Sequence, residues 1–218
     1  TCLKKNGFTN IEIVKEQATP NGDFPTCPYP NPEIREALEV GLNVAKEVGA
    51  DILIATDPDC DRVGIAIKQG DDFRLFSGNE VGVLLTDFIA KRKVAMGIMP
   101  KKPVVVKTIV TTDLANRVAD DYGIETRDVL TGFKYIGDQI ANLEKDGEVD
   151  RYLMGFEESY GYLSGSYVRD KDAVNGAYLI AQMFAYYKAE NKSLLDVLNG
   201  LYEKYGYYLN TLYSFEFE

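Results

Sequence analysis

Histidine is missing from all 218 residues, and this absence excludes several kinds of chemistry from the chain. A Ser-His-Asp triad, a histidine metal ligand and a phosphohistidine all require that residue. Cysteine is scarce, and Cys2, Cys27 and Cys60 form an odd, widely spaced set that matches neither a zinc site nor a disulfide framework. Such cysteine usage fits a reducing compartment, so we expect a cytoplasmic protein. No apolar run approaches the roughly 20 residues of a membrane span, and no internal repeat is visible.

Positive charge is also in short supply. The net charge is -10 and the isoelectric point is near 4.7, which argues against nucleic acid or an anionic membrane as the main partner. A hydrophobic content of 45% and a charged content of 27% are typical of globular domains. An anionic ligand would therefore need a local group of basic residues.

Strand-like and helix-like segments alternate along nearly the whole chain. Short apolar runs rich in β-branched residues predict strands, and apolar residues at helical spacing predict the helices between them. We expect strands at 9–15, 51–56, 63–67, 73–76, 104–110, 125–130 and 151–156, and helices at 31–49, from 80, up to 123, up to 145, from 172 and at 194–205. Such alternation is typical of parallel sheets that helices cover on both faces.

The predicted fold class is therefore α/β, with two consecutive three-layer α/β/α domains and mostly parallel mixed sheets. A stretch containing Gly, Pro and Lys at 96–103 separates the predicted domains 1–102 and 103–205. The chain begins without a methionine, in what resembles the tail of a helix, and residues 213–218 alternate like a strand that should continue. We therefore expect a piece of a longer protein.

The most informative segment is the hexapeptide Asp57-Pro58-Asp59-Cys60-Asp61-Arg62, which lies between two predicted strands. If the loop stays extended, alternation directs the side chains of Asp57, Asp59 and Asp61 to one side. Carboxylates at 4 Å repel by roughly 4 kcal/mol per pair at an effective dielectric of about 20. Such a cluster favours a cation, and an all-oxygen ligand set suits Mg²⁺ better than zinc.

The hexapeptide also resembles an EF-hand loop or a solvated acidic turn. An EF-hand loop starting at Asp57 is excluded, because its sixth and twelfth positions hold Arg62 and Lys68 in place of Gly and Glu. A solvated acidic turn stays open, since Asp and Pro are common turn residues. Arg62 favours the metal interpretation, because a guanidinium beside a metal can bind a phosphate that the metal also contacts.

Three further segments follow predicted strands, where ligands gather in open α/β sheets. Thr131-Gly132-Phe133-Lys134 either starts a helix or lines a site. Glu157-Glu158-Ser159 is either an exposed acidic turn or a set of carboxylates and a hydroxyl that binds sugar hydroxyls. Arg169-Asp170-Lys171-Asp172 either caps a helix through Asp172 or supplies the basic residues that a phosphate needs.

The four segments together resemble the signatures of the α-D-phosphohexomutase superfamily, most closely its phosphoglucomutase/phosphopentomutase branch. The matching stretches are residues 56–62, 131–137, 155–161 and 169–172. The resemblance covers essentially the whole chain and corresponds to the second and third of that family's four domains. It implies that residues 206–218 start a linker to a C-terminal domain, and that N- and C-terminal domains of the same protein are partners of this chain.

The resemblance also implies a role for each matching residue. The implied Mg²⁺ ligands are Asp57, Asp59 and Asp61. The implied substrate-binding residues are Thr131, Gly132, Glu157, Ser159 and Arg169. The implied catalytic residues are Arg62 near the phosphate, Lys134 and Lys171, and which of the two lysines acts as general acid/base stays open, with Lys171 the candidate. Cys60 departs from the small residue that is usual in this branch, and we expect its thiol to point away from the carboxylates.

The implied reaction moves a phosphoryl group between C1 and C6 of a hexose through a bisphosphate intermediate. The implied ligands are glucose 1-phosphate, glucose 6-phosphate and glucose 1,6-bisphosphate. In this family a phosphoserine on the first domain donates the phosphoryl group, and neither that signature nor the fourth domain's is present, so we expect the isolated chain to be inactive. The alternatives are a phosphopentomutase, a sugar-bisphosphate synthase or a non-catalytic sugar-phosphate-binding protein.

Overall fold

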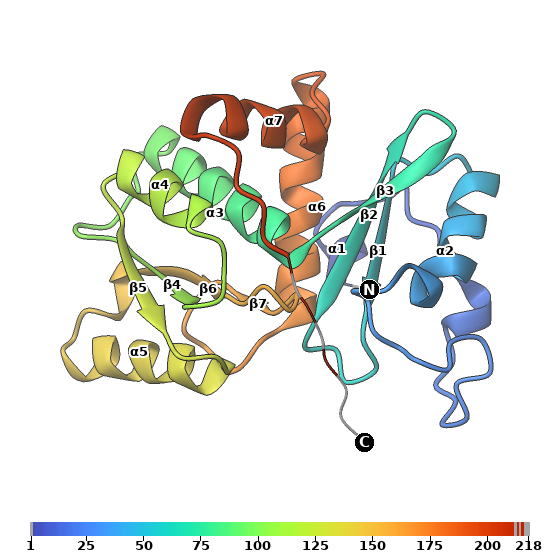
Figure 1. The fold of residues 1–218 in the computed structure, drawn as a ribbon, viewed down its shortest axis with the longest axis horizontal. Helices are drawn as coiled ribbons and strands as arrows, with labels where there is room; N and C mark the ends of the chain where they lie inside the picture. The colour runs from blue at the N-terminus through green and yellow to red at the C-terminus, as the bar shows by residue number, and fades with distance from the viewer. Residues whose placement is uncertain (1, 212, 214, 216–218) are drawn as a thin grey trace.

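Two separate sheets form the frame of the molecule in this computed structural model, which describes residues 2–211, 213 and 215 (Figure 1). The first sheet has the order β1-β2-β3, with β1 at Ile52–Thr56, β2 at Val63–Gln69 and β3 at Asp72–Phe76. The second has the order β5-β4-β6-β7, with β4 at Val104–Thr108, β5 at Glu125–Val129, β6 at Tyr152–Phe156 and β7 at Tyr162–Leu163.

All neighbouring strands of the first sheet are antiparallel, with Thr56 paired to Val63 and Gln69 paired to Asp72. The prediction of a parallel sheet is wrong here, because the connections between the strands are too short. Residues 57–62 join β1 to β2, and residues 70–71 join β2 to β3, whereas a parallel crossover needs about a dozen residues or more. Gly70 has a φ of 61°, as a two-residue hairpin turn requires.

The second sheet is mixed and mostly parallel, which confirms the predicted α/β class. β4 pairs in parallel with both β5 and β6, and the short β7 pairs antiparallel with β6. Because β4, β5 and β6 run in the same direction, the residues that follow them lie at one edge of the sheet. That edge carries residues 109–113, 130–132 and 157–161.

Helices cover both sheets (Figure 1). The main helices are α2 at Arg35–Glu47, α3 at Gly78–Ala95, α4 at Leu114–Asp121, α5 at Phe133–Lys145, α6 at Ala173–Ala189 and α7 at Leu194–Tyr205. The short elements are α1 at Cys2–Lys5, η1 at Lys15–Gln17 and η2 at Val149–Arg151. α3 and α4 lie on one side of the second sheet and α5 on the other, while α2 flanks the first sheet.

The largest buried cluster spans both sheets. It contains the β2 residues Val63, Ile65 and Ile67 together with residues of α3, α6 and α7. Two smaller clusters lie under α5 and under α2. The domain boundary at 102/103 stays a prediction, and the packing partners of α3, which precedes that boundary, include α4, α6, α7 and β6.

Two local predictions are wrong. The predicted strand at 9–15 has no ladder, and Ile13 within it is 52% exposed, because the segment lies outside both sheets and lacks a partner. The helix predicted from Asn31 begins at Arg35, since the Asn31 side chain accepts a hydrogen bond from the Glu33 N–H and holds residues 31–33 in a turn. The predicted strand at 213–218 falls largely outside the described residues, and Tyr213 and Phe215 belong to no element.

Within the described part of the chain, no helix combines the length and the apolar character that crossing a membrane demands.

Candidate functional site

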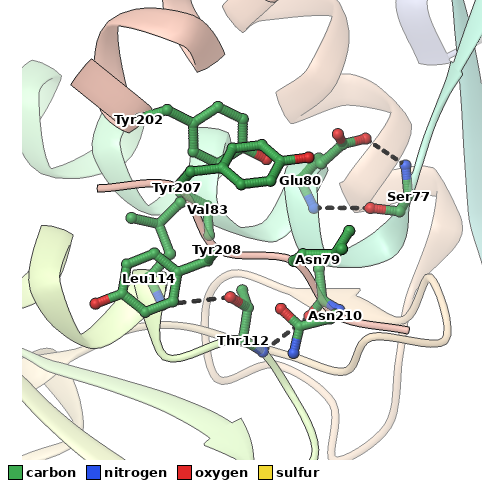
Figure 2. A pocket seen from close by; sticks show the side chains of 11 residues that line it. Ser77, Asn79, Glu80, Val83, Thr112, Leu114, Tyr202, Tyr207, Tyr208 and Asn210 are labelled. Carbon is green, nitrogen blue, oxygen red and sulfur yellow. Dashed lines mark hydrogen bonds between the residues drawn. The ribbon is translucent and has the colours of Figure 1, made fainter. Parts of the chain in front are cut away.

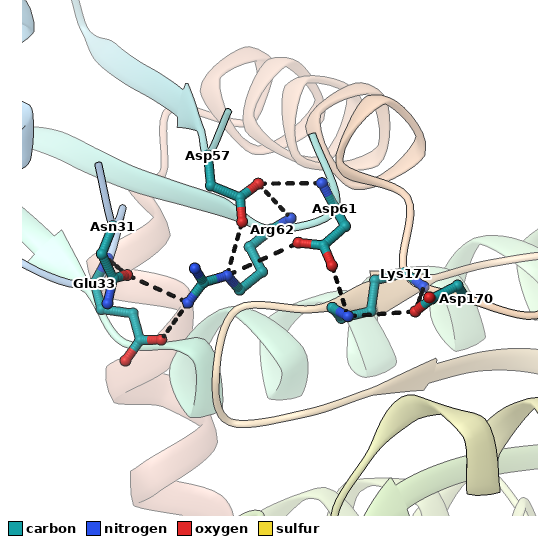
Figure 3. Close-up of polar contacts among 7 residues, drawn as sticks. All are labelled: Asn31, Glu33, Asp57, Asp61, Arg62, Asp170 and Lys171. Atoms are coloured by element: carbon teal, nitrogen blue, oxygen red, sulfur yellow. Dashed lines mark hydrogen bonds and ion pairs between the residues drawn. The ribbon is translucent and has the colours of Figure 1, made fainter. Parts of the chain in front are cut away.

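The hexapeptide between β1 and β2 forms a tight turn (Figure 3). The Asp57 N–H donates to the Arg62 carbonyl at 3.2 Å, and the Cys60 N–H donates to the Asp57 carbonyl at 3.1 Å. The expectation of an extended loop is therefore wrong. The carboxylates nevertheless converge, because one oxygen from each of Asp57, Asp59 and Asp61 lies within 4.8 Å of the others. Turn closure, rather than strand alternation, brings them together.

Asp57 is the anchor of this turn. Its side chain is buried, and its Oδ1 accepts hydrogen bonds from the N–H groups of Asp61 at 3.1 Å and Arg62 at 3.0 Å. Its Oδ2 accepts from the Arg62 Nε at 2.8 Å. Burial alone would raise the pKa of Asp57, but the hydrogen bonds from the Arg62 backbone and side chain outweigh it and hold the pKa below its usual range. The Asp57 side chain is therefore ionised before any cation binds.

Arg62 connects the turn to the segment before α2. Its Nη1 lies 3.1 Å from Glu33 Oε1 and 3.5 Å from Asn31 Oδ1. Sequence reasoning placed Asn31 at the start of a helix and overlooked Glu33, since a contact between residues 29 positions apart leaves no local signal. Arg62 is thus held on both sides, with its guanidinium beside the carboxylate cluster.

Lys171 reaches the same cluster from the segment before α6. Its Nζ lies 2.7 Å from Asp61 Oδ2 and 3.3 Å from Asp170 Oδ1 (Figure 3). Burial would lower the pKa of Lys171, but the hydrogen bond with Asp61 and the nearby charges raise it above its usual value. Burial raises the pKa of Asp61, and Lys171 offsets only part of that effect. The structure therefore brings the first and the fourth predicted segments into direct contact.

Glu157 lies at the carboxyl end of β6 and is 5% exposed. Its Oε1 accepts a hydrogen bond of 2.9 Å from the N–H of Gly132, which follows β5. Gly132 has a φ of 116°, a conformation that side-chain-bearing residues rarely adopt. Burial raises the pKa of Glu157, against the lowering effect of the Gly132 N–H. The second and third predicted segments therefore also meet, with Thr131 exposed and Ser159 half-buried beside them.

Backbone hydrogen bonds join the aspartate turn to the glutamate turn. The Val63 N–H donates to the Tyr160 carbonyl at 3.0 Å, and Arg62 forms an antiparallel bridge with Gly161. The Ala173 N–H donates to the Cys60 carbonyl at 3.1 Å. Three of the four segments are thereby tied together through their main chains.

The predicted site residues Lys134 and Arg169 contact side chains other than those of the carboxylate cluster. Lys134 is exposed, and its Nζ lies 4.9 Å from the centroid of the Tyr135 ring. The Arg169 guanidinium pairs with Glu144 and donates to the Ser166 carbonyl at 2.6 Å. Arg169 is thus engaged with α5, and its role in substrate binding stays a prediction, as does that of Lys134.

A small pocket of about 100 Å³ lies elsewhere, between the start of α3, α7 and residues 207–210 (Figure 2). Its lining includes Tyr202 and Tyr207, whose rings are 4.9 Å apart, but none of the predicted site residues. Ligand pockets usually measure about 300–1,000 Å³. This pocket is too small for a sugar phosphate. The candidate site is the cluster of Figure 3, because the predicted segments meet there.

The carboxylate cluster fits a hard divalent cation. Its donors are three carboxylates without a nitrogen or sulfur ligand, and Mg²⁺ binds through one or two carboxylates plus water and phosphate oxygens. Asp57 is already ionised and its Oδ2 accepts one hydrogen bond, which leaves a lone pair for a metal. The residues present therefore fit the ion that the sequence suggested.

Two family models match nearly the whole chain. Residues 1–70 match the family model for phosphoglucomutase/phosphomannomutase alpha/beta/alpha domain II, and residues 77–205 match the one for domain III. The phosphoglucomutase of Staphylococcus saprophyticus and the phosphomannomutase of Mycoplasmoides pirum are each 38% identical to this chain. Each alignment covers 99% of this chain, but only 39% and 38% of those two proteins. The chain thus spans well under half the length of these relatives.

A solved structure shows the same fold. The phosphoglucomutase/phosphomannomutase family protein from Burkholderia thailandensis superposes with a TM-score of 0.59 at 19% identity. The superposition covers 79% of this chain and 33% of that one.

Proposed function

Because the chain belongs to the phosphoglucomutase/phosphomannomutase family, we propose that the full-length protein is a phosphosugar mutase that interconverts hexose 1-phosphate and hexose 6-phosphate. The observation that carries this proposal is the convergence of the aspartate turn, Lys171 and the Glu157 turn in one place. Phosphoryl transfer needs positioning and charge stabilisation above all, and these groups supply both.

Asp57, Asp59 and Asp61 would hold Mg²⁺ in this proposal. When bound, the ion would supply positive charge to the oxygens of the transferring phosphoryl group. Arg62 already donates to Asp57 through Nε, and its guanidinium would donate a charge-assisted hydrogen bond to the phosphate. The buried Asp57 would therefore bind the metal and also orient Arg62.

The sugar would lie against the second sheet. Glu157 and Ser159 can accept from and donate to neighbouring sugar hydroxyls, with Thr131 and Gly132 beside them. Lys171 is charged, so its Nζ could give a proton to an oxygen of the sugar and, once neutral, take one back. Lys134 and Arg169 would contact the substrate from the periphery.

The reaction in this proposal passes through glucose 1,6-bisphosphate, with the phosphoryl group supplied by a phosphoserine on another domain of the protein. Glucose 1-phosphate and glucose 6-phosphate are then the substrate and product. We also propose a cytoplasmic location, in line with the free thiols of Cys2, Cys27 and Cys60. The 218-residue chain alone should show no mutase turnover, and measurable turnover by this purified chain would contradict that expectation.

The decisive experiment measures turnover by the full-length protein on glucose 1-phosphate and on deoxyribose 1-phosphate, with and without Mg²⁺. Faster Mg²⁺-dependent conversion of the hexose supports the proposal, and faster conversion of the pentose replaces it with a phosphopentomutase. Accumulation of a sugar bisphosphate indicates a synthase of the same family. Failure of both substrates, even with glucose 1,6-bisphosphate as primer, leaves a non-catalytic sugar-phosphate-binding protein.

A further inference from the structure

Glu158 has an anchoring site of its own, although the residue roles implied by the resemblance do not include it. Its Oε2 lies 3.0 Å from the Thr108 hydroxyl and 3.1 Å from the Thr111 hydroxyl, and the two hydroxyls are 2.7 Å apart. Thr108 is the last residue of β4 and Thr111 lies in the loop that follows, whereas Glu158 follows β6. The contact thus crosses between neighbouring strands at the edge where the candidate site lies.

The two threonines are themselves fixed. Both are buried, and the side chain beside them, Lys107, has no exposed surface. The Lys107 Nζ donates to the Thr111 carbonyl at 3.1 Å and pairs with Asp128 at 2.8 Å. A buried ammonium with such partners rigidifies its surroundings, because each broken contact would leave a charge or a carbonyl unsatisfied. The hydroxyls that hold Glu158 therefore belong to a rigid part of the second sheet.

The main chain of the Glu158 turn is also confined. A Cβ placed on Gly78, the first residue of α3, would lie 1.9 Å from the Glu158 carbonyl oxygen and 2.9 Å from the Tyr160 nitrogen. Tyr160 adopts a φ of 68°, which is uncommon for an aromatic residue. The backbone of the turn is therefore in close contact with α3, and the Glu158 side chain adds its contacts with the two threonines.

We propose that Glu158 is a positioning residue, whose anchorage to Thr108 and Thr111 sets the places of Glu157 and Ser159 on either side of it. This inference rests on the proposed function, in which those two neighbours bind the sugar. A displacement of about 1 Å in a group that orients a substrate can cost about 100-fold in rate. The loss of the anchor should therefore act on catalysis through its neighbours.

The test compares Glu158→Ala with a matched control in the full-length protein. Asp87 on α3 is also a largely buried carboxylate that accepts from two hydroxyls, those of Tyr122 at 2.9 Å and Tyr187 at 3.3 Å, but it lies outside the candidate site. Asp87→Ala should lower the melting temperature without changing kcat/KM for the sugar phosphate. Glu158→Ala should lower kcat/KM by about 100-fold.

Hydrogen exchange provides a second readout that does not need turnover. The Gly132 N–H donates to Glu157 Oε1, so a displaced Glu157 should speed exchange in the peptide that contains Gly132. We expect this acceleration in Glu158→Ala and not in Asp87→Ala. Glu158→Gln keeps an oxygen that can accept from the threonines, and it should restore most of the protection and of kcat/KM.

Equal effects of the two alanine variants on both readouts, or no effect of Glu158→Ala on either, would overturn the proposal. If Glu158→Ala does not fold, Thr111→Val decides, since it removes one of the two hydroxyls at nearly constant volume. It should speed exchange at Gly132 and lower kcat/KM, and the absence of both changes would overturn the proposal. Failure of the wild-type protein to turn over sugar phosphates contradicts the proposed function alone, because the exchange comparison still tests the anchor.

Discussion

The aspartate turn and the glutamate turn hold their carboxylates by different means. Asp57 accepts from the N–H groups of residues four and five positions later, within its own turn. Glu157 and Glu158 accept from groups 25 to 50 positions earlier, on the ends of β5 and β4. The first arrangement forms as soon as one hairpin closes, whereas the second requires an assembled parallel sheet. Damage to the second sheet should therefore displace the proposed sugar-binding groups more than Asp57, whose backbone hydrogen bonds stay within its own turn.

Asp57→Ala should have the largest effect, because it removes both a proposed metal ligand and the partner of Arg62. We expect the affinity of the full-length protein for Mg²⁺ to fall by about 100-fold or more, since loss of even an outer-shell partner of a metal costs 10–100-fold. Calorimetric titration with Mg²⁺ measures the change. Asp72→Ala is the control, because this exposed carboxylate on β3 pairs with Arg35 and Lys46 on α2. Unchanged Mg²⁺ affinity in Asp57→Ala would remove the basis of the metal assignment.

Lys171→Met should have the next largest effect, because Lys171 is the side chain that links the two turns. It contacts Asp61 directly, and its charge acts on Glu157. We expect kcat to fall by about 100-fold, the lower end of the usual contribution of a general acid/base. The matched Lys134→Met should cost less, since Lys134 is exposed, and Lys188→Met is a control at an exposed pair with Asp51. A greater loss in Lys134→Met than in Lys171→Met would reverse the proposed roles of the two lysines.

Glu157→Gln should separate stability from substrate binding in the glutamate turn. Burial raises the pKa of Glu157 in the folded state, so ionisation of this group opposes folding once the pH rises through that pKa. The wild-type protein should therefore lose stability as the pH rises from the unfolded-state pKa of Glu157 through its raised folded-state pKa, and Glu157→Gln should lose less while still accepting from Gly132. Thermal unfolding between pH 5 and pH 8 measures this difference. The same variant should bind sugar phosphate more weakly, and an identical pH slope in both proteins would argue against a desolvated carboxylate.

Cys60→Ala should have the smallest effect. Cys60 is half-buried, packs against the large apolar cluster and adopts a φ of 60° within the aspartate turn. Since its thiol lies among apolar side chains, we expect Mg²⁺ affinity to be unchanged and stability to change by about 1 kcal/mol or less. Titration with Mg²⁺ and chemical unfolding check both. A clear loss of metal affinity would assign the thiol a part in the site.

Local signals in the sequence predicted local structure well. The helix expected at 194–205 is α7, and Asp172 caps α6 through hydrogen bonds to the N–H groups of Val174 and Asn175. The strands on both sides of the hexapeptide are also confirmed. In each case a pattern of apolar residues or a capping side chain within a few positions is sufficient to determine the element.

Longer-range features could not be predicted in the same way. The antiparallel first sheet follows from the length of its connections, which alternation of strands and helices does not reveal. The pairs Arg62–Glu33 and Arg169–Glu144 join residues that are 29 and 25 positions apart. Neither pair leaves a pattern in the chain, so sequence reasoning located the four site segments but not the contacts that hold them.

The apolar cluster that contains the β2 side chains limits which segments of this protein can be exchanged with those of a homologue. The two family models divide the chain between residues 70 and 77, but Val63, Ile65 and Phe76 pack in the same core as α3 and α6. Each such side chain contributes roughly 1.5–3 kcal/mol when fully buried. A chimera with its crossover at that division would place one parent's β2 against another parent's helices, and mismatched shapes would open cavities. Viable exchanges between homologues should therefore transfer residues 31–205 as one block, since α2 also packs against the first sheet and Glu33 pairs with Arg62.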